Sequence, residues 1–202
     1  MGLPTTAGNP DRNRRHIERL RRVLSKEAPV PRAKLATNAK GAAVLVPIFE
    51  RNGELHLVYI RRADNVSSHR GQVAFPGGRV DPSDVTLLDT ALREAQEEVA
   101  IDPLTVEVLG AFPEMSTLTS GIIVAPFAGV IPATTALSPC FEEVAEIFEV
   151  PLGALRDPRY RGHYQWGGNR SRFPAILYGG QTIWGLTLRI TESLLAILDS
   201  SP

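Results

Sequence analysis

The sequence predicts a layered domain of the α/β or α+β class, with strands and helices interleaved along the chain. Short apolar segments bounded by turn residues indicate strands, and longer segments repeat apolar residues at helical spacing. Size and composition agree with this class. The chain has 202 residues, of which 43% are hydrophobic and 22% charged, as is typical of one globular domain with a substantial core.

The first predicted helix spans residues 11–25 and carries much of the positive charge. Its apolar residues recur at helical spacing, namely Ile17, Leu20 and Leu24. Residues 11–40 hold ten of the 22 Lys and Arg residues but only three acids, although the whole chain has no net charge. We interpret the basic residues as the solvated face of an amphipathic helix rather than an arm that binds phosphate or nucleic acid. Residues 1–40 are therefore expected to form a tail and a basic helix ahead of a main domain over 41–202.

Two strands joined by a tight turn are predicted next. The continuous apolar run 42–49 indicates a buried strand, and Pro47 within it indicates a bulge or a sheet edge. Asn52-Gly53 is a strong hairpin signal, so residues 55–62 are expected to form the return strand.

The remaining elements follow the same two patterns. A helix is predicted over residues 84–100, where apolar side chains recur at helical spacing. Further strands are expected at 106–112, 122–131, 146–150, 164–166 and 175–178. A helical turn at 152–155 and a C-terminal helix over 186–197 complete the prediction.

Composition excludes several classes of protein. The single cysteine, Cys140, excludes an internal disulfide framework and a cysteine-based zinc cluster, and it favours a cytoplasmic location. The longest apolar run, 121–131, is too short to span a bilayer. No apolar segment follows the N-terminal arginines, so no secretory signal and no membrane partner are expected. A neutral chain is also not expected to bind nucleic acid.

The residues that indicate chemistry lie on the predicted helix 84–100. Glu94, Glu97 and Glu98 are spaced i, i+3 and i+4 and therefore share one helix face. A solvated acidic face is the plain alternative, but a Gly-rich turn at 75–78 leads into this helix and lets backbone approach a ligand. Carboxylates so placed suit a hard divalent cation, either Mg²⁺ or Mn²⁺. Arg93 lies one turn before Glu97 and is expected to orient it.

One segment resembles the Nudix box, and it reads Gly78-x5-Asp84-x8-Arg93-Glu94-Ala95-x-Glu97-Glu98-x-Ala100-Ile101. It departs from the family pattern in three ways: Asp84 replaces a glutamate, one extra residue precedes Arg93, and Ala100 replaces a glycine. The resemblance implies a Nudix-type α/β/α sandwich with a mixed sheet, here with an N-terminal helical extension. It also implies that a metal ion is bound by the Gly78 carbonyl, Glu94, Glu97 and Glu98. In addition, it implies that Arg93 orients the acids.

A second motif lies upstream of the box and reads Arg62-Ala63-x3-Ser67-x3-Gly71-x3-Phe75-Pro76-Gly77-Gly78. It is similar to the motif that precedes the box in the coenzyme A pyrophosphatase subfamily, which has arginine where Ser67 stands. Residues 143–152 and 183–187 also resemble that subfamily. The resemblance implies substrate phosphate contacts from Arg62, His69 and Arg70.

The function implied by the two motifs is metal-dependent hydrolysis of coenzyme A to 4′-phosphopantetheine and adenosine 3′,5′-bisphosphate. The general base stays open among Glu97, Glu98, Glu114 and Glu143. Two alternatives remain: the same chemistry on ADP-ribose, a dinucleotide or a nucleoside triphosphate, and a non-catalytic nucleotide-sensing or nucleic-acid-binding module. The resemblance also leaves a homodimer open.

Aromatic residues give a weaker signal. Phe75 is expected in the core rather than against a base. Four other aromatic residues are candidates to flank a nucleotide base, namely Tyr164, Trp166, Tyr178 and Trp184. Aromatic residues in short strands more often belong to a core or an interface.

Overall fold

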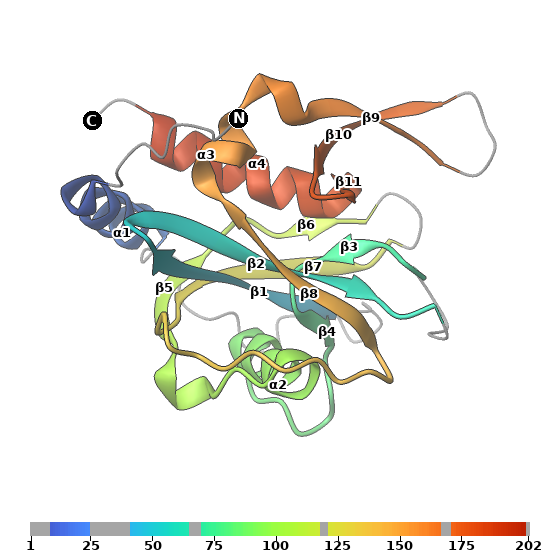
Figure 1. Ribbon diagram of the computed structural model, residues 1–202. Coiled ribbons are helices and arrows are strands. Elements are labelled where there is room, and N and C mark those ends of the chain that lie inside the picture. The colour runs from blue at the N-terminus through green and yellow to red at the C-terminus, as the bar shows by residue number, and fades with distance from the viewer. Residues whose placement is uncertain (1–8, 25–40, 65–69, 118–120, 167–170, 201–202) are drawn as a thin grey trace.

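The computed structural model describes residues 9–24, 41–64, 70–117, 121–166 and 171–200. Helices cover both faces of one large sheet (Figure 1). Helix α2 (Leu87–Val99) lies on one face, and helices α1 (Pro10–Leu24) and α4 (Gly185–Asp199) lie on the other. This arrangement is the predicted α/β/α sandwich with its N-terminal helical extension. No helix among the described residues is long and apolar enough to cross a membrane.

The large sheet has eight strands in the central order β3-β2-β1-β7-β5, while β4 pairs with β1, β6 with β7 and β8 with β2. It is mixed, because β1 and β7 run parallel and the other pairs antiparallel. Its strands are β1 (Gly41–Arg51), β2 (Glu54–Arg62), β3 (Val73–Ala74), β4 (Gly77–Arg79), β5 (Glu107–Ala111), β6 (Met115–Ser116), β7 (Ile123–Val130) and β8 (Val144–Pro151). Short helices α3 (Leu152–Arg156), η2 (Pro103–Thr105) and η3 (Pro158–Tyr160) join later elements.

Strand β1 is apolar from residue 41 to residue 49 because both of its faces are buried there. Val46 and Ile48 belong to the core that α1 and α4 cover, whereas Leu45 and Phe49 belong to the core under α2. Successive strand side chains point to opposite faces, so a strand between two helical layers has no polar face. Helix α1 joins the first core through Leu20, which is fully buried.

The position of Pro47 within the apolar run predicted a bulge or a sheet edge. In the structure Pro47 lies at neither. Strand β1 pairs with β7 along residues 41–48, and on its other side it pairs first with β4 through Val44 and then with β2 from Ile48. Pro47 falls in the gap between these two partners, where a residue without an N–H is tolerated. The predicted hairpin turn is confirmed, since Asn52 and Gly53 both have positive φ angles, 51° and 76°.

Helix α2 begins at Leu87, three residues later than the predicted start. Thr86 and Asp89 form a reciprocal capping box: the Asp89 N–H donates to Thr86 Oγ1 at 3.1 Å, and the Thr86 N–H donates to Asp89 Oδ2 at 2.8 Å. The helix ends at Ala100, which adopts the left-handed conformation with φ 60° and ψ 31°. Ala100 therefore stands at the helix end where the family pattern has glycine, and it adopts the left-handed conformation that glycine favours.

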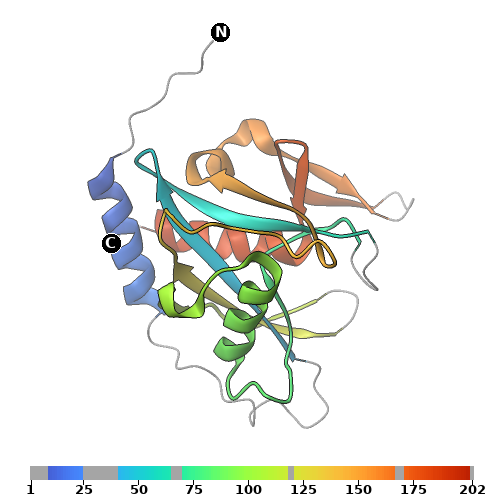
Figure 2. The ribbon, with the colours of Figure 1, turned by 60° about the horizontal axis from the view of Figure 1, so that its bottom comes forward.

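A small antiparallel sheet, β9 (Arg161–Gln165), β10 (Arg172–Tyr178) and β11 (Gln181–Trp184), stands apart from the large one. Its inner face buries Ile176 and Ile183 in the same core as α4. Figure 2 shows the small sheet and α2 lying away from each other, with the large sheet between them. The sequence pattern indicated strands here but not a separate sheet. Phe75, as expected, is buried and stacks on Tyr59.

Candidate active site

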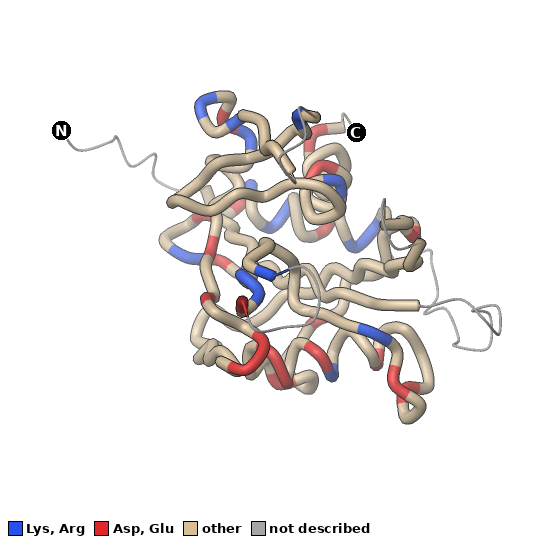
Figure 3. Tube along the Cα trace, turned by 90° about the vertical axis from the view of Figure 1, so that its right-hand side faces the viewer, with Lys and Arg blue, Asp and Glu red and all other residues tan. Residues whose placement is uncertain are grey.

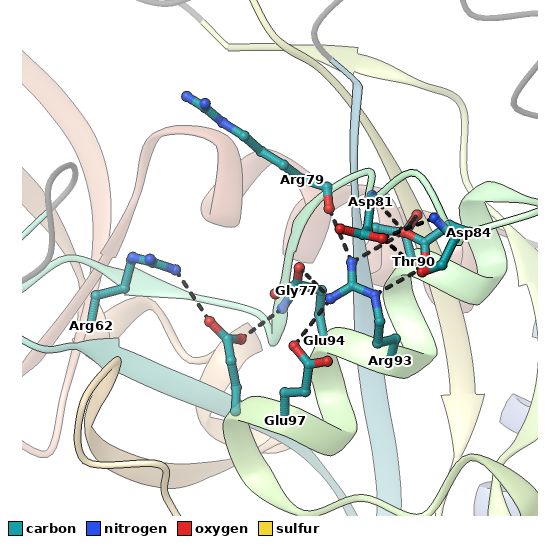
Figure 4. Close-up of polar contacts among 11 residues, drawn as sticks. Arg62, Gly77, Arg79, Asp81, Asp84, Thr90, Arg93, Glu94 and Glu97 are labelled. Carbon is teal, nitrogen blue, oxygen red and sulfur yellow. Dashed lines mark hydrogen bonds and ion pairs between the residues drawn. The ribbon is translucent and has the colours of Figure 1, made fainter.

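Helix α2 carries Glu94, Glu97 and Glu98, and Figure 4 shows the first two beside the turn that contains β4. The Glu94 carboxylate lies against Gly78 of that turn, and Glu98 accepts the Gly77 N–H. The side chains of the three acids differ sharply in exposure: Glu97 is 60% exposed, Glu94 15% and Glu98 2%. The exposed fraction of the three side chains therefore decreases from Glu97 through Glu94 to Glu98, which is buried.

Arg93 joins the outer two acids to the loop before the helix. Its Nη1 donates to Glu94 Oε1 at 2.9 Å and to Glu97 Oε2 at 3.1 Å. Its Nε and Nη2 donate to the two oxygens of Asp84 at 3.0 and 3.1 Å, and Nη2 also donates to the Arg79 carbonyl at 3.1 Å. A planar guanidinium with several donors suits this fork-like arrangement, in which one cation fixes three carboxylates and a strand end.

Asp84 faces Arg93 rather than the acidic face of α2. It is buried, and its Oδ2 also accepts the Thr90 hydroxyl and the Asp81 N–H, each at 2.8 Å. Burial alone would raise the pKa of Asp84, but hydrogen bonds from Arg93, Asp81 and Thr90 hold it below the ordinary value. Asp84 is thus an ionised anchor for Arg93.

Glu98 is the buried member of the acidic face. Its Oε2 accepts the Gly77 N–H at 2.8 Å, and its Oε1 contacts Arg62 Nη1 at 3.3 Å. Burial raises the pKa of Glu98 to about 7, against the opposing effects of the Gly77 hydrogen bond and the Arg62 charge. The charge on this side chain is therefore only partly compensated by its protein neighbours.

The two glycines of the turn are needed for close packing. Gly77 has φ 154°, and a Cβ there would collide with the backbone of β1 at Ala43 and Val44. A Cβ on Gly78 would collide with the Glu94 carboxylate. The absence of side chains therefore lets Glu94 lie directly against the turn whose Gly78 carbonyl was singled out in the sequence.

The donor set fits a hard divalent cation by its chemistry. Burial raises the pKa of Glu94 as well as that of Glu98, so a bound cation would favour the charged forms that burial disfavours. Among the described residues no three His, Cys, Asp or Glu side chains converge as a ready-made metal cluster. The reason is visible in the contacts, since Arg93 holds Glu94 and Glu97 while Gly77 holds Glu98. Gathering the three acids around one ion requires their side chains to turn.

The two arginines at the end of β2 diverge, as neighbouring strand residues must. Arg61 contacts Glu146 on β8 at 3.4 Å, whereas Arg62 contacts Glu98. Arg70 is exposed, and His69 and Ser67 lie outside the described residues. Figure 3 shows acidic residues gathered around α2 and basic residues between them and the small sheet.

The two downstream acids differ in position. Glu143 contributes to the raised pKa values of both Glu94 and Glu98 through its charge, and it follows a segment whose Cys140 N–H donates to the Glu98 main-chain carbonyl at 3.0 Å. Glu114 is exposed between β5 and β6 and is not among the charges that shift either pKa.

Sequence reasoning did not identify the Gly77 N–H, Thr90 and the Arg79 carbonyl as parts of this network. A local signal existed only for the helix start, where Thr86-x-x-Asp89 matches a capping box. The Gly77 N–H, Thr90 and the Arg79 carbonyl act through contacts between distant segments, and no local sequence pattern indicates such contacts.

Comparisons with known proteins relate the chain to one family. A family model described as the NUDIX domain matches residues 39–167. An uncharacterized Nudix hydrolase, NudL, from Yersinia enterocolitica is 44% identical over 165 residues, covering 79% of this chain and 82% of the relative. Its namesake from Cronobacter sakazakii is 42% identical over 167 residues, covering 82% and 86%. A solved NUDIX hydrolase from Alicyclobacillus acidocaldarius is 18% identical, with a TM-score of 0.48, and covers 82% of this chain and 98% of that one.

Proposed function

The chain belongs to the Nudix family of hydrolases, and we propose that it cleaves the pyrophosphate bond of coenzyme A or its derivatives. The products would be 4′-phosphopantetheine and adenosine 3′,5′-bisphosphate. Hydrolysis of a pyrophosphate-containing substrate, generally with a divalent metal, is the activity of the family. The substrate, the site residues and the choice between Mg²⁺ and Mn²⁺ belong to the proposal, as does a cytoplasmic location.

The contact between Arg62 and Glu98 carries the substrate proposal. Arg62 begins the upstream motif that resembles the coenzyme A subfamily, and Glu98 ends the acidic series of the box. Their 3.3 Å approach joins the two motifs in one site. An arginine beside the acidic face suits a pyrophosphate, which carries negative charge close to the metal that neutralises it.

In this proposal Glu94, Glu97, Glu98 and the Gly78 carbonyl hold the cation. The bound cation supplies charge neutralisation and acidifies water. Arg93 aligns Glu94 and Glu97 and is itself fixed by Asp84. Arg62, His69 and Arg70 hold substrate phosphates. Glu143 is favoured over Glu114 as the general base, because its charge acts on both Glu94 and Glu98.

Ser67 supports one alternative substrate class. It stands where the subfamily motif has arginine, so this sequence lacks the cation that the motif places at that position. The alternative is the same reaction on ADP-ribose, a dinucleotide or a nucleoside triphosphate.

A mass-resolved hydrolysis assay tests the proposal. Wild type and Glu97→Gln are each given coenzyme A, dephospho-coenzyme A, ADP-ribose, a diadenosine polyphosphate and a nucleoside triphosphate with Mg²⁺ or Mn²⁺. We expect wild type to release adenosine 3′,5′-bisphosphate from coenzyme A and Glu97→Gln to lose that activity. Weaker cleavage of dephospho-coenzyme A would indicate that the 3′-phosphate is read.

Glu192→Gln is the matched control. Glu192 is an exposed glutamate on α4, paired with Arg161 on the far side of the large sheet from α2. This variant should keep full activity. Preference for another substrate would retain the site and reject coenzyme A, and full activity of Glu97→Gln would reject the site.

A further inference from the structure

Arg79 is the last residue of β4, and its main chain is fixed from two sides. In the strand register it lies opposite Ala42 of β1. Its carbonyl accepts a hydrogen bond from Arg93 Nη2 at 3.1 Å, and the same arginine holds Glu94 and Glu97. The position of Arg79 is therefore tied to the guanidinium that holds the outer acids of the candidate site.

The side chain of Arg79 is exposed and unpaired. Its guanidinium neither donates a hydrogen bond nor forms an ion pair within the part of the chain that the structure describes. Figure 4 shows it extending from the turn away from Arg93 and Glu97. Arg62 and Arg93, by contrast, both pair with acids of α2. Exposed arginines are common on protein surfaces, so the place of Arg79 decides what it can bind.

Arg79 stands directly beside the carbonyl proposed to bind the cation. It shares a peptide unit with Gly78, and neighbouring Cα atoms are about 3.8 Å apart. A Cβ on Gly78 would lie 2.3 Å from Glu94 Oε2, so the Glu94 carboxylate covers one side of the strand at this point. Successive strand residues point to opposite sides, so the Arg79 side chain leaves from the side that Glu94 does not cover. That side is the one left for a phosphate group bound beside Gly78.

No further strand separates Arg79 from the acids among the strands that the structure describes. Strand β4 pairs with β1 alone. At its other edge the Gly77 N–H donates to Glu98 Oε2 at 2.8 Å, so the acidic face of α2 reaches the open edge of β4. A ligand held at this edge meets carboxylates on one side of the strand and the Arg79 guanidinium on the other.

We infer that Arg79 is a substrate-binding residue that holds the pyrophosphate group, an inference that rests on the proposed function. A pyrophosphate carries charged oxygens on both phosphorus atoms, and a guanidinium can donate two parallel N–H···O bonds to one phosphate. Arg62 is already engaged by Glu98 at 3.3 Å, so its charge is shared with the acids. Arg79 supplies a second cation whose charge no carboxylate of the described chain neutralises.

Three variants test the contact by kinetics. Arg79→Gln removes the cation and keeps the main-chain carbonyl that Arg93 contacts. Its kcat/KM should fall about ten- to a hundredfold, and equally for coenzyme A and dephospho-coenzyme A, because both contain the pyrophosphate. Arg79→Lys keeps the charge without the fork geometry and should recover part of the loss. Arg22→Gln removes an exposed arginine from α1, across the large sheet from α2, and should change nothing.

Two binding measurements separate a substrate contact from a change in the metal site. Methylenediphosphonate is a pyrophosphate analogue that cannot be hydrolysed at its bridge. Its Kd with Mg²⁺ present, measured by calorimetry, should rise in Arg79→Gln by a factor similar to the kinetic loss. Mn²⁺ alone, measured by electron paramagnetic resonance, should bind this variant no more weakly than wild type, and the thermal midpoint should be unchanged.

Each outcome decides for or against the contact. Unchanged kcat/KM and Kd in Arg79→Gln would overturn the inference, as would weaker Mn²⁺ binding or a loss confined to coenzyme A, which would point to the 3′-phosphate. If wild type cleaves ADP-ribose instead of coenzyme A, and Arg79→Gln slows that reaction by the same factor, the proposed substrate fails while the pyrophosphate contact stands. If wild type cleaves neither, the Kd of methylenediphosphonate alone decides.

Discussion

Helices α2 and α4 cover opposite faces of the same sheet, yet they differ in what they bury. Helix α4 packs through Leu188, Leu194 and Leu198, and its buried polar groups are neutral hydroxyls. Those hydroxyls are satisfied, because Thr191 donates to the Thr187 carbonyl at 2.9 Å and shares a 3.0 Å hydrogen bond with Tyr59. Helix α2 instead buries the carboxylate of Glu98, whose pKa is raised to about 7.

The two helices therefore bury polar groups with opposite effects on stability. A satisfied hydroxyl contributes to stability, whereas a buried carboxylate with a raised pKa reduces it. Proteins retain such destabilising groups where function needs them. We therefore expect substitutions on α2 to change activity and stability in opposite directions, and core substitutions on α4 to change stability alone.

Replacing Glu98 with glutamine tests the α2 side of this comparison and has the largest expected effect. Activity should fall by about two to four orders of magnitude, as is usual when a catalytic group is removed. Stability of the metal-free chain should rise. The pKa of Glu98 is about 7 in the folded chain and 4.5 as its ordinary value, so the unfavourable charge is absent below pH 4.5, grows between pH 4.5 and 7, and is complete above.

Urea unfolding in a chelator measures the stability part of this prediction. At about pH 8 the Glu98→Gln variant should gain on the order of 1–3 kcal/mol, and at about pH 4 the gain should vanish. Glu192→Gln on α4 is the control and should stay within about 0.5 kcal/mol at both pH values. A gain that did not depend on pH would contradict the account of Glu98.

Leu194→Ala tests the α4 side and comes second in size. Leu194 is 1% exposed in the core shared with α1, so the lost contacts and the cavity should cost about 2–5 kcal/mol. The kcat of the folded enzyme should not change, because Leu194 is on α4, which covers the opposite face of the sheet from α2. Denaturant midpoints and single-temperature kinetics measure the two quantities, and a lower kcat without lost stability would break the comparison.

Ala100→Gly should give the smallest change, a gain of about 0.5–1 kcal/mol. Ala100 holds the left-handed cap of α2, a conformation that glycine adopts without steric cost. The corresponding cap of α4, Ser200, is extended with φ −60° and ψ 138°, so Ser200→Gly should gain nothing. Thermal unfolding of the pair of variants measures the contrast. Equal gains would show that the cap of α2 carries no special strain.

Local features of the fold could be predicted from the sequence. Asn52-Gly53 encodes its turn through positive φ angles, and the spacing of Glu94, Glu97 and Glu98 encodes a shared helix face. The start of α2 was placed three residues early because Asp81-Pro82-Ser83-Asp84 resembles a helix start, while Thr86 and Asp89 form the actual capping box. Only the surrounding fold decides between two such neighbouring signals.

Features that depend on distant segments could not be predicted in this way. The burial of Glu98 requires Gly77 from β4 and Arg62 from β2, and no spacing along α2 contains that information. Pro47 was assigned to a bulge or a sheet edge because the sequence does not show that β1 changes partners along one side. The separate sheet β9–β11 likewise depends on register between strands.

The position of Arg93 also bears on the order of events in the life of the protein. Its guanidinium already gives Glu94, Glu97 and Asp84 a positive partner within the chain itself. The fold around α2 therefore carries an internal counterion for these acids, and we expect it to assemble without a captured ion, unlike small domains that stay unfolded until metal binds. On this expectation, synthesis and ion loading are independent steps.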